Sequence, residues 1–444
     1  MENFEILGLN DVLNKSLKKM GFIYPTPIQS KAIPIILSGK DILGSASTGT
    51  GKTGAFAIPV IEKILNSKEH CALIVTPTRE LAKQVIEVFR NLLGNSNPVK
   101  ACCLIGGEAI GKQLNQLKRK PRIIVGTPGR INDHLEKKSL SLMNSVYLVL
   151  DETDRMLDMG FGIQIDQILK FMPNKKQTLM FSATLPKNIV NLATKYLIKP
   201  EKITMNIENS ISKNIKHEVI HVDNAAKYKT LLAQLEIRDG AVLVFAKTKH
   251  STEKIAKNLK KDGIKSNALN GDLRQSKRNK VMRGFKENQF KVLVATDIAS
   301  RGLDVPHLKH VINYDLPQVA EDYIHRIGRT ARAGANGEAI CFVSPNEGHL
   351  WINIDTLVNP DAKNSISSRR GVSNKRNSRK KVKNKFKTSE NSGKKYKGKS
   401  KFKKSEKDEK KFKGKKRSAS KKTIRSSDAK PKKRFYPAKK KKVR

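Results

Sequence analysis

The sequence predicts an α/β protein with two tandem domains, each a parallel sheet covered by helices, and a disordered basic C-terminal tail. With 444 residues the chain is long enough for two domains of ordinary size and a further segment. Short β-branched runs alternate with helical stretches, a pattern typical of parallel sheets buried on both faces. These runs are DILGSA, CALIVT, RIIVGT, VYLVLDE and QTLMFSAT, followed by AVLVFAKT, KVLVATD, KHVINYD and EAICFV.

The domain boundary is expected where this alternation is interrupted. The first series of runs ends near Pro200 and the second begins near His217, with the polar segment EKITMNIENSISKNIK between them. Near residue 360 the composition changes to Lys, Arg, Ser and Asn without an apolar period, which disfavours a packed fold. The predicted division is therefore a first domain over 1–205, a second over 206–360 and a disordered tail over 361–444.

The formal net charge of +49 favours a polyanionic partner, because Lys and Arg that neutralise phosphates release counterions. Residues 361–444 hold 37 of the 89 Lys and Arg but only 6 of the 40 Asp and Glu, so the tail alone carries +31. Nucleic acid is the first expectation and an anionic membrane surface the second. Isolated Phe and Tyr residues in the tail are suited to stacking on bases.

The chain shows no pattern of a secreted or membrane-spanning protein. Its N-terminus lacks a basic-then-apolar signal, and there is no uncharged apolar stretch of about 18 residues. The four cysteines have neither metal-binding spacing nor a disulfide framework, and we expect them to be buried core residues in a reducing compartment. These features predict a cytoplasmic protein.

The segment DILGSASTGTGKTGAF predicts a phosphate-binding turn between a strand and a helix. Backbone N–H groups of such a turn, together with the helix N-terminus, can surround phosphate oxygens. Lys52 would reach the β- and γ-phosphates, and the Thr53 hydroxyl would bind Mg²⁺. The strict pattern has Gly where this chain has Ala46, so an incidental loop is the alternative. The residues expected to contact nucleotide are Ala46, Ser47, Thr48, Gly49, Thr50, Gly51, Lys52 and Thr53.

The second motif is acidic and lies in SVYLVLDETDRMLDMGF, where two carboxylate residues follow directly after an apolar stretch that is expected to be a buried strand. Acids are costly at such a place unless they face a cleft or a cation. Asp151 is suited to hold Mg²⁺ through water, and Glu152 is suited to orient and deprotonate the attacking water. The alternative interpretation is an acidic helix cap.

From Phe4 to about Phe342 the chain resembles the core of DEAD-box RNA helicases, which consists of two RecA-like domains. The motifs that carry the resemblance are GFIYPTPIQ, GTGKT, PTRELA, GG, TPGR, DETD, SAT, NGDLRQSKR, VATDIASRGLDVP and YIHRIGRTARAG, in this order. The resemblance implies an enzyme that uses ATP and Mg²⁺ and locally unwinds RNA with little sequence preference. It implies that Gln29 reads the adenine edge, that Phe22 stacks on the base and that Asp304 approaches the ribose.

The resemblance also assigns roles around the phosphates and the RNA. It implies that Arg329 and Arg332 are arginine fingers that stabilise charge on the γ-phosphate, although arginines at this spacing are otherwise ordinary helix-surface residues. Ser182, Thr184 and His325 would couple the nucleotide state to RNA, while His325 alone would suggest a structural histidine. The implied RNA contacts are Arg79, Gly107, Thr127, Gly129, Arg130, Gly271, Arg278 and Thr296, with Gln275 and Asp297 as further RNA-side or coupling candidates.

Two residues depart from the family pattern. Thr153 replaces the alanine of Asp-Glu-Ala-Asp, and Ala331 replaces a glycine in the last motif. All ionisable groups are retained, so activity is expected to survive.

A DNA-directed helicase and a non-enzymatic RNA-annealing protein are the alternatives to an RNA helicase. The expected partners are structured or duplex RNA and possible ribosomal or mRNA-decay complexes, and the chain is expected to be a monomer.

Overall fold

The computed structural model describes residues 3–46, 49–94, 97–205, 214–300, 303, 305, 307–331 and 335–359. The predicted tail over 361–444 lies outside the described residues. Within the described ranges, no helix is both long and apolar enough to span a bilayer.

The first sheet is parallel throughout, and its strand order is β3-β4-β2-β5-β6-β1-β7. Its strands are β1 (Ile42–Ser45), β2 (Cys71–Val75), β3 (Ala101–Leu104), β4 (Ile123–Gly126), β5 (Ser145–Leu150), β6 (Gln177–Ser182) and β7 (Glu201–Thr204). The surrounding helices are η1 (Phe4–Leu7), α1 (Asp11–Lys19), α2 (Pro27–Leu37), α3 (Lys52–Leu65), α4 (Arg79–Leu93), α5 (Ile110–Leu117), α6 (Pro128–Glu136), α7 (Thr153–Asp158), α8 (Gly162–Leu169) and α9 (Lys187–Tyr196). We refer to these elements as the first lobe.

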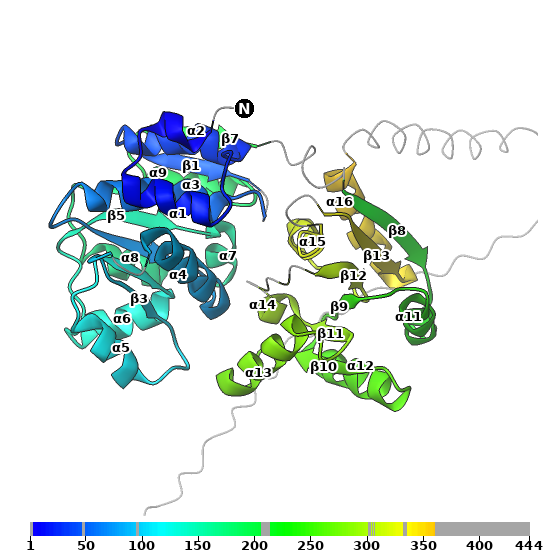
Figure 1. Ribbon diagram of the computed structural model, residues 1–444. Helices are drawn as coiled ribbons and strands as arrows, with labels where there is room; N and C mark the ends of the chain where they lie inside the picture. The colour runs from blue at the N-terminus through cyan, green and yellow to red at the C-terminus, as the bar shows by residue number, and fades with distance from the viewer. Residues whose placement is uncertain are drawn as a thin grey trace, which may run out of the picture. The chain divides into compact units, whose positions relative to one another are not determined.

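The second sheet is also parallel, in the order β10-β11-β9-β12-β13-β8. Its strands are β8 (Ile215–His221), β9 (Ala241–Phe245), β10 (Ser266–Leu269), β11 (Val292–Ala295), β12 (Leu308–Asn313) and β13 (Gly337–Val343). Its helices are α11 (Lys227–Glu236), α12 (Lys249–Lys261), α13 (Gln275–Lys286), α14 (Asp297–Ser300), α15 (Ala320–Ile327), η3 (Pro345–Glu347) and α16 (Gly348–Val358). These elements form the second lobe (Figure 1). The predicted fold class, parallel sheets covered by helices, is confirmed for the described residues.

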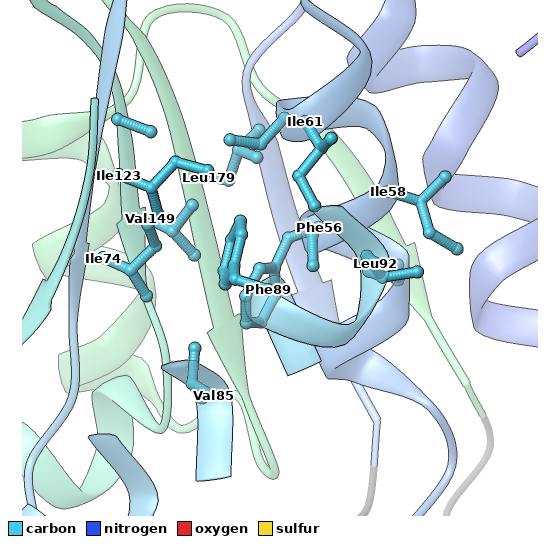
Figure 2. Packing of buried hydrophobic residues seen from close by; sticks show 14 of the residues in the cluster. Phe56, Ile58, Ile61, Ile74, Val85, Phe89, Leu92, Ile123, Val149 and Leu179 are labelled. Atoms are coloured by element: carbon cyan, nitrogen blue, oxygen red, sulfur yellow. The ribbon is translucent and has the colours of Figure 1, made fainter. Parts of the chain in front are cut away.

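Successive residues of the central strands face opposite sides of the first sheet, as the two-residue period of a strand requires. Val149 and Leu179 belong to the cluster that includes Phe56 of α3 and Phe89 of α4 (Figure 2). Leu148, the neighbour of Val149, belongs to the cluster on the opposite face. Each buried strand thus packs against helices on both sides, which explains its near-continuous apolar sequence.

The predicted connection between the domains contains one more strand than the sequence pattern indicated. Glu201–Thr204 form β7, which pairs with β1 at the edge of the first sheet. Only Ile203 of this strand is buried, so an edge strand could be missed by its apolar pattern. The exact domain division stays a prediction, since residues 206–213 lie outside the described residues.

Three of the cysteines are buried as expected, whereas Cys71 is partly exposed. Burial raises the pKa of Cys102 to about 12. It raises that of Cys341 to about 11. These thiols therefore stay protonated and behave as small core side chains.

Candidate nucleotide and RNA sites

The phosphate-binding turn connects β1 to α3 at the carboxyl end of the parallel strands, which is where ligands bind in such sheets. Gly51 caps α3 with a left-handed φ of +95°. A Cβ at this position would lie 2.6 Å from Gln29 Nε2 and 2.7 Å from Thr26 Oγ1. Glycine is therefore required here both by the backbone and by the close approach of α2. Ser47 and Thr48 lie outside the described residues.

Gln29 lies directly against this turn. Its Nε2 donates to the Gly51 carbonyl at 3.0 Å, and its Oε1 accepts from Thr26 N at 3.0 Å. Phe22 retains 36% exposure, whereas Phe4 is packed in the core of the first lobe. The motif GFIYPTPIQ therefore joins the phosphate-binding turn to a partly exposed aromatic ring.

Lys52 and Asp151 lie buried at the ends of α3 and β5, which come from distant parts of the sequence. Lys52 Nζ is buried and makes no hydrogen bond within the described residues. Burial raises the pKa of Asp151 to about 7, although the positive charge of Lys52 opposes this shift. A buried cation and a buried carboxyl with few protein partners are suited to bind an anion and a cation, respectively.

Glu152 is the N-cap of α7 and has a left-handed φ of +52°, an uncommon conformation for a residue with a side chain. Burial works to raise the pKa of this carboxyl, but the charges of Arg155 and Arg329 outweigh burial and lower it. Arg155 Nε lies 3.6 Å from Glu152 Oε2. The carboxylate is therefore held ionised at neutral pH, as a general base requires.

Asp154 connects the first lobe to α15 of the second. Its Oδ2 accepts a hydrogen bond from Ala183 N at 3.2 Å, next to the buried Ser182. The same Oδ2 lies 3.4 Å from His325 Nε2. Burial works to raise the pKa of Asp154, but the bond and charge of His325 lower it. The structure thus brings together His325 and the SAT segment, which ends at the buried Thr184.

Arg329 is 4% exposed, unlike a helix-surface arginine. Its Nε donates to the His325 carbonyl at 3.0 Å and its Nη1 to the Leu303 carbonyl at 3.1 Å. Its positive charge helps to lower the pKa of Glu152, as described above. Arg332 and Asp304 lie outside the described residues, so their predicted roles stay predictions.

Ala331, which stands where the family pattern has glycine, has a left-handed φ of +53°. A residue with a Cβ typically loses about 1–2 kcal/mol in this conformation. Its methyl group packs against the second-lobe cluster that contains Tyr323 and Ile327. The turn before Arg332 therefore keeps a glycine-like backbone despite the substitution.

A cleft of about 490 Å³ contains most of the predicted RNA contacts. Six of them line it: Arg79, Thr127, Gly129, Arg130, Gly271 and Arg278. Gly107 is not among the lining residues, but it packs against the Arg79 guanidinium. Thr296 is buried and does not line the cleft.

Residues of the two lobes bond to each other inside this cleft. Arg278 Nε lies 2.6 Å from Glu80 Oε1, and Arg79 Nη1 donates to Gln275 Oε1 at 2.7 Å. Glu80 was not predicted, although it follows Arg79 in PTRELA. Because the arginines already have acidic or amide partners, a polyanion entering the cleft would have to compete with Glu80.

Arg326 is another residue that the motif analysis missed. It is 2% exposed and forms a two-pronged ion pair with Asp297, with distances of 2.6 and 2.8 Å. Its Nη1 also donates to Asn313 Oδ1 at 2.9 Å. The signal was its place in HRIGR, between His325 and Arg329. Arg326 joins α14 to α15 and so fixes the helix that carries His325 and that ends two residues before Arg329.

The fold and these contacts define a two-lobed nucleotide-dependent enzyme, and comparisons with known proteins identify its family. A family model described as DEAD/DEAH box helicase matches residues 26–192, and one described as helicase conserved C-terminal domain matches 223–334. The DEAD-box ATP-dependent RNA helicase CshA of Bacillus cereus is 43% identical over 357 residues, covering 80% of this chain and 68% of the relative. CshA of Bacillus subtilis is 42% identical over 346 residues, covering 78% and 70%.

A solved structure has the same architecture with ligands bound. S. cerevisiae Dbp5 bound to RNA and ADP BeF3 is 31% identical, with a TM-score of 0.74 over 81% of this chain and 94% of that one. The chain belongs to the DEAD-box ATP-dependent RNA helicases. It binds ATP and RNA and unwinds RNA with ATP hydrolysis, which decides against the DNA-directed and non-enzymatic alternatives.

Proposed function

We propose that ATP is hydrolysed between α3, the Asp151–Glu152 turn and α15. Lys52 binds the β- and γ-phosphates, and the turn from Ala46 to Gly51 surrounds them with backbone N–H groups. The observation that supports this proposal is the buried Lys52 ammonium, which makes no hydrogen bond within the described residues although it lies beside a Gly-rich turn. Gln29 and Phe22 hold the adenine, and Asp304 approaches the ribose.

Glu152 acts as the general base that takes a proton from the attacking water. Its lowered pKa supports this role, because an ionised carboxylate can accept the proton at neutral pH. Arg329 and Arg332 stabilise the charge that develops on the γ-phosphate.

Mg²⁺ fits the donors at this site. Magnesium is usually held by one or two oxygen ligands of the protein together with substrate phosphates. The Thr53 hydroxyl and the Asp151 carboxylate supply such oxygens, and a nearby divalent cation would favour the ionised form of Asp151. The ion would neutralise phosphate charge in the transition state.

RNA lies in the 490 Å³ cleft, where Arg79, Arg130 and Arg278 are supplied by both lobes. RNA therefore favours the arrangement in which His325 contacts Asp154 and Arg329 acts on Glu152. Ser182 and Thr184, next to Ala183, carry this coupling to β6. Contacts to phosphates and sugars predict little sequence preference.

Arg130→Gln is expected to weaken RNA binding roughly tenfold, uniformly across sequences, and to lower the salt slope by about one unit. Arg130 lines the cleft, and its Nε forms an ion pair with Asp133 Oδ2 at 3.3 Å. RNA affinity measured by fluorescence anisotropy at several salt concentrations tests this. Arg119→Gln, which removes an exposed arginine outside the cleft, is the control. An equal loss in both variants would argue against the cleft as the RNA site.

The basic tail over 361–444 is proposed to add non-specific RNA affinity, which raises the local RNA concentration for the enzyme. Within the cell we propose a cytoplasmic monomer that works on ribosomal or mRNA-decay complexes. The division of the chain into domains over 1–205 and 206–360 is part of the same proposal.

Removing residues 361–444 is expected to lower the affinity for RNA and the salt dependence of RNA binding. The rate of ATP hydrolysis without RNA should be unchanged. Each lost phosphate contact on single-stranded RNA should lower the slope of log affinity against log salt by about 0.7. Replacing the tail aromatics by Leu in the full chain keeps the charge, and therefore should keep the slope. These aromatics are Phe386, Tyr396, Phe402, Phe412, Phe435 and Tyr436. An unchanged slope after truncation would show that the tail does not bind RNA phosphates.

A further inference from the structure

Thr153 makes a buried contact that the family's alanine cannot make. The residue is 0% exposed, and its Oγ1 donates to the Phe181 carbonyl at 2.8 Å. A longer contact of 3.4 Å joins the same hydroxyl to the Leu150 carbonyl. Thr153 is the first residue of α7 and directly follows Glu152. The hydroxyl therefore links the catalytic turn to β6.

This bond continues the β5–β6 pairing beyond its last strand residues. The ladder between the two strands ends with Leu150 opposite Met180. Phe181 is the next residue of β6, and its carbonyl accepts the Thr153 hydroxyl instead of a backbone N–H of β5. An alanine would remove this side-chain donor from a buried carbonyl, which is unfavourable.

Phe181 also packs against α3 and β1, the two elements that flank the phosphate-binding turn. Its ring lies 5.5 Å from that of Phe56 in α3 and packs over Gly44 of β1. The residue after Phe181 is Ser182, and Ala183 N donates to Asp154. Two adjacent residues, Thr153 and Asp154, thus bond to Phe181 of β6 and to Ala183 directly after this strand.

We propose that Thr153 is a positioning residue that couples RNA binding to hydrolysis. His325 of the second lobe contacts Asp154, which bonds to Ala183, and the Thr153 hydroxyl carries any displacement of this strand to the adjacent Glu152. Glu152 has a left-handed conformation, which persists only where the surrounding contacts hold it, and the Thr153 bond is the contact next to it. The inference rests on the proposed role of Glu152 as general base.

Three variants separate the hydroxyl from the volume of the side chain. Thr153→Val keeps the shape without the donor, Thr153→Ala restores the family residue, and Thr153→Ser keeps the donor in a smaller side chain. With the full chain, RNA-stimulated kcat is expected to fall roughly threefold to tenfold in the Val and Ala variants, the range of one buried hydrogen bond. The RNA-free rate and the KM for ATP should stay within about twofold. The Ser variant should regain most of the RNA stimulation.

Ser266→Ala is the matched control, since it removes a buried hydroxyl that donates to the Ala256 carbonyl at 2.8 Å in the second lobe. It should leave RNA stimulation unchanged. Wild-type RNA stimulation in folded Thr153→Val, or an equal loss in Thr153→Ser, would overturn the proposal. If Glu152→Gln kept full activity, the proposed catalytic role of Glu152 would be wrong. If Glu152→Gln were inactive while the Thr153 variants kept normal RNA stimulation, only the coupling role of Thr153 would be rejected.

Discussion

Lys52→Ala is expected to lower RNA-stimulated ATP hydrolysis by roughly 10²–10³-fold, the loss typical of one preorganised electrostatic contact to a transition state. Lys52 is 7% exposed, and its ammonium makes no hydrogen bond within the described residues, so its loss removes phosphate binding without breaking a hydrogen bond among them. Steady-state hydrolysis with structured RNA, with single-stranded DNA and without nucleic acid measures the effect.

Lys63→Ala is the matched control for this substitution, because it removes the same charge near the other end of α3. Its hydrolysis rate should remain close to that of the unchanged protein. A Lys52→Ala enzyme that still responds fully to RNA would place the phosphate site elsewhere. Equal stimulation of the unchanged protein by DNA would contradict recognition of RNA through its sugars.

Glu152→Gln is expected to lower kcat by roughly 10²–10⁴-fold, the usual contribution of a general base, while RNA binding in the presence of ATP persists. Glutamine keeps the size of the side chain and an acceptor oxygen but cannot take the proton. The measurements are RNA-stimulated kcat and RNA affinity with a non-hydrolysable ATP analogue. If the carboxylate acts in chemistry alone, the factor by which kcat falls should be at least ten times the factor by which RNA affinity falls.

Glu62→Gln provides the control for this change. Glu62 is also buried in the first lobe, and its Oε2 accepts from Asn10 N at 2.8 Å, a bond that an amide oxygen can still accept. Its kcat should be nearly unchanged. Parallel loss of RNA binding and kcat in Glu152→Gln would instead indicate a structural role, exerted through the ion pair with Arg155.

Much of the site could be predicted because its chemistry lies in short contiguous motifs. Lys52 follows a Gly-rich turn and Asp151 ends an apolar strand, so each carries its signal within a few residues. Arg79 and Arg130, which line the cleft proposed to bind RNA, were predicted in the same way, through motif order. Edge strand β7 was missed, because a strand with one buried residue leaves little apolar pattern.

Partners that meet across the two lobes could not be predicted from any single segment. Glu80 is 198 residues from Arg278 in sequence, yet the two form an ion pair. The position of Arg326 in HRIGR marked it as a motif residue, but its burial and its contact with Asp297 became visible only in the structure. Such pairings depend on helix direction and burial, which the residues next in sequence do not determine.

The sequence by itself determined the family and the parallel α/β class, and it was sufficient to predict the phosphate-binding turn and the two acidic residues proposed to be catalytic, because spacing along one strand or turn fixes these features locally. Only the tertiary structure decided that Thr153 bonds to Phe181, that Asp154 joins His325 to Ala183 and that Glu152 stays ionised. Hydrogen bonds and pKa shifts depend on distance and burial in space, and those follow from how the strands and lobes pack together.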